Sequence, residues 1–183
     1  MQYELTAYVA DSEYLANSKP VLEIPSAQTV YAIWIGTNDL GNDAFMTDSQ
    51  IKGKTVLDYI DCVYQAIDKL YRYGGRNFVL MNVSPLNLLP QYALPEKGGR
   101  TATPFWPKKG SNLTEISYRM AQTVATVNEI FKYRTASAFK IEGKYSGAQL
   151  ALYDTNALVR YAVFARFLLL YLNSNLLTAT VAD

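Results

Sequence analysis

Apolar residues alternate with polar stretches along this chain in an order that predicts helices alternating with strands. Leu5, Tyr8, Val9 and Leu15 recur at roughly helical spacing, so we expect a short helix over residues 2–15. The run 29–35 is continuously apolar, which is typical of a strand covered on both faces. A second buried strand is expected over 77–83 and a third over 148–153.

Two long amphipathic helices are expected between these strands. The first has apolar residues at steps of three and four, and Gly74 and Gly75 end it. Ser111 or Asn112 caps the second. The apolar faces consist of Val56, Ile60, Val63, Ile67 and Leu70 in the first, and of Leu113, Ile116, Met120, Val124, Val127 and Phe131 in the second. The alternation predicts an α/β domain with a parallel sheet and helices on both faces.

The other segments are expected to be irregular or to pack against a partner. Residues 36–53 form a polar loop, and 86–110 form a long loop with four prolines and three glycines. Loops of that length are usually functional or disordered. The apolar segment 157–172 is interrupted by Arg160 and Arg166, whereas a membrane span needs about 20 mostly apolar residues. We therefore expect no membrane span, and a tail that could mediate self-association.

Composition adds few constraints. The chain has 183 residues, half of them hydrophobic and 18% charged, which suits one globular domain. A net charge of +1 gives no electrostatic footprint for nucleic acid. Its 15 tyrosines suit carbohydrate contacts or, alternatively, packing at layer edges. The single cysteine, Cys62, rules out an intrachain disulfide, and the polar first residues lack the apolar core of a signal peptide.

The apolar run 29–35 stops abruptly at Gly36-Thr37-Asn38-Asp39. α/β enzymes place their chemistry at the carboxyl ends of strands. In acyl transfer, the side-chain amide of Asn38 could stabilise the negative charge that develops on the carbonyl oxygen. Gly36 would let the loop turn and leave room for the acyl group, and Asp39 would brace the loop. The alternative is an ordinary turn, because all four are common turn residues.

The chain contains no histidine, so the usual general base of a serine hydrolase is missing. The acidic residues do not form a cluster at ligand spacing, and we expect Asp43, Asp48, Asp58 and Asp61 on solvated faces rather than around a metal. No cofactor is expected.

Three further residues have open alternatives. Trp106 is either an exposed aromatic contact or a hydrophobic plug of the long loop. Asn112 begins the glycosylation sequon Asn112-Leu113-Thr114, which favours a secretory origin. Asn82-Val83-Ser84 also matches the sequon, but Asn82 lies at a strand end and is expected to be buried.

Residues 31–41, YAIWIGTNDLG, resemble the third conserved block of the SGNH, or GDSL, ester hydrolases. The stretches 57–71, 75–89 and 148–154 resemble fungal acetylesterases of carbohydrate esterase family sixteen, and together the similarity spans about residues 1–159. The resemblance implies a flavodoxin-like three-layer sandwich, an oxyanion-hole role for Asn38 and catalysis by a serine and a histidine. It also implies an extracellular enzyme whose substrates are acetylated sugars or other small esters.

The sequence departs from this family at the other three blocks. Ala10-Asp11-Ser12 is the nearest string to Gly-Asp-Ser, but it lacks the glycine and follows no strand, so we interpret Ser12 as a helix-end residue. Asp154-Thr155-Asn156-Ala157 is not the Asp-x-x-His block, because Ala157 stands at its fourth position.

The expectation is therefore an incomplete SGNH domain over 1–159, followed by an apolar tail over 160–183 that lacks family resemblance, as after a misjoined exon. Such a chain has no nucleophile or base of its own and should have little or no activity. One alternative is a catalytically dead remnant that binds carbohydrate or protein. The other is an unrelated α/β domain with a chance Gly-x-Asn-Asp.

Overall fold

A three-stranded parallel sheet forms the centre of the computed structural model, which describes residues 2–16, 19–20, 25 and 27–166. Its strands are β3 (Val30–Ile33), β4 (Asn77–Met81) and β5 (Gln149–Tyr153), in that order across the sheet. Ile33 pairs with Leu80, and Leu80 pairs with Leu152. The predictions of three strands and of a parallel sheet are confirmed.

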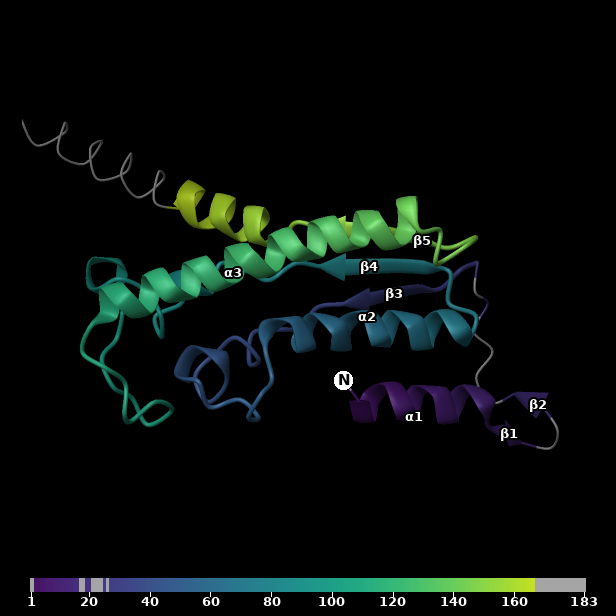
Figure 1. The fold of residues 1–183 in the computed structure, drawn as a ribbon, viewed down its shortest axis with the longest axis horizontal. Helices are drawn as coiled ribbons and strands as arrows, with labels where there is room; N and C mark the ends of the chain where they lie inside the picture. The colour runs from purple at the N-terminus through teal and green to yellow at the C-terminus, as the bar shows by residue number, and fades with distance from the viewer. Residues whose placement is uncertain (1, 17–18, 21–24, 26, 167–183) are drawn as a thin grey trace, which may run out of the picture.

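Two helices connect these strands, as predicted. α2 (Val56–Arg72) leads from β3 to β4, and α3 (Leu113–Ala136) leads from β4 to β5; both run alongside the strands (Figure 1). α2 begins where the Asp58 carboxylate accepts hydrogen bonds from the Thr55 backbone N–H (2.8 Å) and hydroxyl (2.9 Å). α3 begins where the Asn112 side chain accepts one from the Glu115 N–H, and a π-helical turn, Ser137–Ile141, follows it.

Both connecting helices pack on the same face of the sheet. The Phe131 ring of α3 lies 6.0 Å from the Tyr59 ring and 6.4 Å from the Tyr64 ring of α2, between centroids. Since connections between parallel strands are right-handed and the strands follow one another in order, both crossovers fall on one side. The strand side chains that face this core are Tyr31, Ile33, Phe78, Leu80, Leu150 and Leu152.

The opposite face of the sheet is open within the described ranges. Val30 is 59% exposed, and Trp34, just past the end of β3, is 61% exposed. The prediction that this strand is covered on both faces is therefore wrong, and the described helices α2 and α3 do not supply the second helical layer of a sandwich. The sequence led to this wrong prediction because Val30, Ala32 and Trp34 are apolar although they point outward. A strand covered on one face normally alternates apolar and polar residues, and here that alternation is absent.

The N-terminal residues form α1 (Gln2–Glu13), as predicted, and α1 lies beside α2 (Figure 1). The Tyr8 and Tyr31 hydroxyls are 2.7 Å apart, which ties α1 to β3. A small antiparallel pair that the sequence did not predict follows, β1 (Leu15–Ala16) and β2 (Lys19–Pro20). Short 3₁₀ turns occupy Phe45–Thr47, Leu86–Leu88 and Pro95–Lys97.

The segment after β5 is helical over 155–166, which agrees with the first part of the expected apolar helix. The rest of that segment, and residues 167–183 as a whole, lie outside the described residues. Among the helices that the structure describes, none is both long and apolar enough to cross a bilayer.

Candidate functional site

The Gly36–Asp39 loop lies at the carboxyl end of β3 and is closed by its own backbone. The Leu40 N–H donates to the Gly36 carbonyl (2.9 Å), and the Gly41 N–H donates to the Asn38 carbonyl (3.1 Å). The Asp39 carbonyl accepts from the Phe45 N–H at 3.2 Å, and Leu40 is fully buried beneath the loop. The loop is therefore a defined turn rather than an open connection.

Gly36 is required by both conformation and space. Its φ is +121°, which side-chain-bearing residues rarely adopt, and an added Cβ would lie 2.3 Å from the Tyr59 hydroxyl oxygen and 3.3 Å from the Val83 Cγ2. The Tyr59 hydroxyl donates a hydrogen bond to the Ile35 carbonyl at 3.0 Å. Burial, followed by the charge of Asp39, raises the pKa of Tyr59, so this hydroxyl stays a neutral donor.

Asn38 is exposed at the tip of this turn. Within the described part of the chain its side-chain amide makes no hydrogen bond, so both amide hydrogens are available to a ligand. Asp39 is half-buried, and its carbonyl helps to close the loop. The oxyanion role of Asn38, the geometric role of Gly36 and the bracing role of the Asp39 side chain stay predictions.

The neighbouring strand end, after β4, is held by an asparagine from α3. Asn128 Oδ1 accepts from the Val83 N–H (2.8 Å), and Asn128 Nδ2 donates to the Val83 carbonyl (2.9 Å). Asn156 Nδ2 donates to the same carbonyl at 3.0 Å. Because Val83 stands against Gly36, Asn128 indirectly supports the candidate loop.

A hydrogen bond between the buried Asn82 and the exposed Asp154 joins the carboxyl ends of β4 and β5. Asn82 Nδ2 donates to Asp154 Oδ1 (2.8 Å), and Asn82 Oδ1 accepts from the Asn156 N–H (2.9 Å). Asp154 Oδ1 also accepts from the Ala157 N–H at 2.9 Å, so Asp154 caps the helix over 155–166. Asn82 is 7% exposed, which confirms its expected burial. Its position directly after a strand could have marked it as part of this edge.

The remaining sequence candidates are scattered. Ser12 Oγ donates to the Val9 carbonyl in the last turn of α1, which confirms Ser12 as a helix-end residue. Three of the four aspartates pair with separate cations: Asp48 with Arg119, Asp58 with Lys54 and Asp61 with Arg134. No group of three or more His, Cys, Asp or Glu side chains that could hold a metal occurs in the described ranges.

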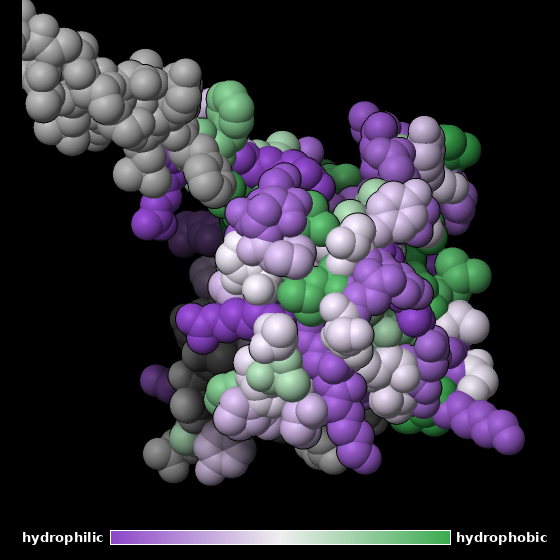
Figure 2. Space-filling model, turned by 90° about the vertical axis from the view of Figure 1, so that its left-hand side faces the viewer, coloured by the Kyte–Doolittle hydropathy of each residue, from purple (hydrophilic) through white to green (hydrophobic). Residues whose placement is uncertain are grey.

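The two adjacent aromatic residues of the long loop have opposite environments. Trp106 is 8% exposed and its ring lies 5.9 Å from that of Tyr92, so it is a plug and not the exposed contact. Phe105 is instead 83% exposed. Figure 2 views the end of the molecule at which the strands finish, where mainly polar and neutral side chains surround a few hydrophobic ones.

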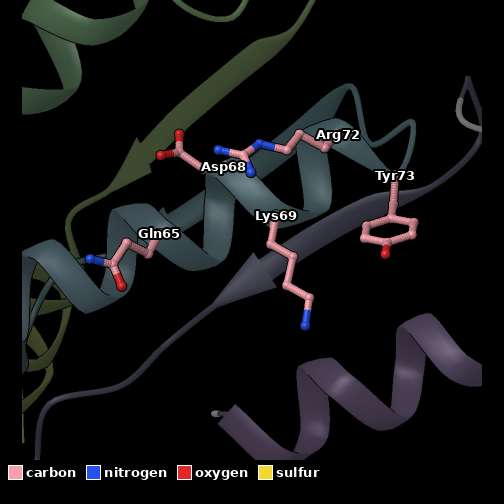
Figure 3. Close-up of a pocket in the computed structure, with 5 residues that line it drawn as sticks. All are labelled: Gln65, Asp68, Lys69, Arg72 and Tyr73. Atoms are coloured by element: carbon pink, nitrogen blue, oxygen red, sulfur yellow. The ribbon is translucent and has the colours of Figure 1, made fainter.

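A groove on the C-terminal half of α2 lies away from this edge (Figure 3). It is lined by Gln65, Asp68, Lys69, Arg72 and Tyr73. Lys69 points toward α1 and donates to the Thr6 hydroxyl, and Asp68 is paired with Lys144 at 2.9 Å. These contacts are structural, and the groove is not part of the candidate site.

Comparison with known proteins gives one informative relative. No protein-family model matches the chain. An acetylesterase from Hypocrea jecorina is 33% identical to it over 157 residues, which cover 85% of the chain. This chain is related to an acetylesterase. It spans 44% of the length of that acetylesterase, so the activity of the whole relative is a proposal for this chain.

Proposed function

We propose that this chain forms the oxyanion-hole part of a GDSL-type carboxylic ester hydrolase with the SGNH fold. The observation that carries the proposal is the exposed amide of Asn38, which has no hydrogen-bond partner among the described residues, at the carboxyl end of a parallel strand. It lies on a turn where Gly36 has a positive φ and no room for a Cβ. The similarity to an acetylesterase supports the same reaction class.

The complete reaction is an acyl transfer from an ester to water. A serine hydroxyl attacks the ester carbonyl carbon while a histidine accepts its proton, and the oxygen gains negative charge that the Asn38 amide stabilises. The alcohol leaves with a proton from the histidine, and water then releases the acid and regenerates the serine. The proposed substrates are acetylated sugars or small esters.

We propose that the isolated chain has little or no esterase activity, because it contains no histidine to act as the base. Folded protein incubated with a fluorophosphonate and analysed by intact mass tests this. No adduct is expected, whereas a single stable adduct would show that the chain itself activates a serine.

The esterase role is tested by replacing the matched segment of the Hypocrea acetylesterase with this chain's residues. We expect the chimera to hydrolyse p-nitrophenyl acetate, and Asn38→Ala in it to lower kcat by roughly 100- to 1000-fold. Thr37→Ala, at the neighbouring exposed position, is the matched control and should keep the rate. A folded but inactive chimera, or an Asn38→Ala chimera with an unchanged rate, would overturn the proposal.

A second candidate is a catalytically dead protein that binds carbohydrate or a partner protein, and the exposed Phe105 favours it. Saturable ligand binding by the chain, together with an inactive chimera, would support this reading. For either candidate we propose a location outside the cell, which the exposed Asn112 of the glycosylation sequon supports. Detection of a glycan on Asn112 after expression in the native host would test this location.

A further inference from the structure

The long loop forms a groove of about 460 Å³, two of whose lining residues hydrogen-bond to Asn42 of the segment that follows the candidate loop. Leu89, Pro90 and Phe105 contribute apolar surface to it, and Arg100, Thr101 and Thr103 contribute polar groups. The lining therefore combines the exposed ring of Phe105 and a largely buried Trp106 with several hydrogen-bonding groups.

The exposure of Phe105 is fixed by the structure of its turn. The Trp106 N–H donates to the Thr103 carbonyl (2.9 Å), the Thr103 N–H donates back at 3.3 Å, and Pro104 restricts the backbone between them. The buried Trp106 anchors the turn, with Lys109 Nζ 5.4 Å from its ring centroid. The Phe105 ring is thus exposed to solvent on a turn whose backbone conformation is restricted.

The same turn is attached to the candidate oxyanion loop through Asn42. Asn42 Nδ2 donates to the Phe105 carbonyl at 3.1 Å, and the Asn42 N–H donates to the Tyr92 hydroxyl at 3.1 Å. Gln91 also donates to Asn42 Oδ1. Because Asn42 lies only four residues after Asn38, these hydrogen bonds hold the groove in a defined position relative to the candidate site.

We propose that this groove binds a sugar ring, with Phe105 as the surface against which the ring packs. A pyranose has an apolar face of C–H groups and an edge of hydroxyls, which match the aromatic ring and the polar rim. The sugar is then the alcohol part of the ester, and in this respect the inference rests on the proposed function. Binding itself requires no catalysis and can be measured on this chain.

The test uses tryptophan fluorescence. The chain has two tryptophans, so Trp34→Phe leaves Trp106, in the groove, as the sole reporter. Titration with cellotetraose should change its emission saturably, and calorimetry should give the same Kd. Phe105→Ala should weaken Kd by roughly three- to tenfold, while Phe105→Tyr retains the affinity. Phe164→Ala removes another exposed phenylalanine and should have no effect.

Two results would overturn the proposal. One is the absence of binding by both methods, with cellotetraose and with its acetylated form. The other is binding of cyclohexanol with equal affinity and the same dependence on Phe105, which would indicate a general apolar groove. Hydrolysis of p-nitrophenyl acetate by the chimera involves no sugar, so the esterase proposal can stand if this one fails, and the reverse also holds.

Discussion

At the scale of single residues, Gly36 has little freedom to vary. Gly36→Ala must tolerate a positive φ and a Cβ 2.3 Å from the Tyr59 hydroxyl. Backbone strain and overpacking each cost about 1–3 kcal/mol, so we expect the free energy of unfolding to fall by about 2–6 kcal/mol. Urea denaturation measures this loss.

Gly53→Ala is the matched control, because Gly53 also has a positive φ, of +80°, but an added Cβ would meet no atom within 4 Å. It should cost about 1 kcal/mol, from backbone strain alone. Tyr59→Phe in the Gly36→Ala background should recover part of the loss. Equal losses at Gly36 and Gly53 would mean that the contact with Tyr59 is unimportant.

Tyr31 is expected to lower the stability of the folded protein at alkaline pH. Burial, followed by the hydrogen bond with Tyr8, raises the pKa of Tyr31 to about 12 from its ordinary value of 10.0. The unfolded chain therefore loses this proton at lower pH than the folded chain, and the contribution present below pH 10 disappears as the pH rises toward 12. Urea midpoints at pH 9 and pH 11 should differ less in Tyr31→Phe than in the original protein; an unchanged difference would contradict this.

At the scale of elements, Asn128 connects α3 to the end of β4. Asn128→Ala leaves the Val83 N–H without its acceptor and removes one donor to its carbonyl, a loss of about 1–3 kcal/mol. Hydrogen exchange at the Val83 amide should accelerate in this variant. Thr126→Ala, on the exposed side of α3, is the control. Retained protection at Val83 would show that Asn128 does not hold this strand end.

Helices and strands could be predicted from the sequence where a single periodicity of apolar residues identified them. The three- and four-residue spacing of α2 predicted its buried face, and the polar residues after each strand marked the carboxyl edge. Neighbouring residues in irregular backbone were not predictable: the burial of Trp106 and the exposure of Phe105 depend on the hydrogen-bonded turn. Asn128 carried no signal, because an asparagine on the polar side of a helix resembles any solvated residue.

At the scale of the whole molecule, we expect the face of the sheet that the described helices leave open to mediate association. Val30 and Trp34 occupy outward positions of the same strand and its end, and both expose apolar side chains. Exposed apolar patches of this kind promote contact with other molecules. We expect the apparent mass in light scattering to rise with concentration. The double variant Val30→Lys, Trp34→Lys should reduce this rise, whereas Tyr133→Lys on α3 should not. A concentration-independent monomer would contradict the expectation.

The pairing of the strands also has a kinetic consequence. Val30 pairs with Asn77 and Asn77 pairs with Gln149, so each contact in the sheet closes a loop that contains a whole helix. Such distant closures cost entropy before hydrogen bonds compensate for it, and they make folding slow. The turn at Gly36 needs Tyr59 from one helix and Val83 from the end of the second strand. We therefore expect a newly made chain to form its helices early and the turn that carries Asn38 to be among the last parts to reach its final shape.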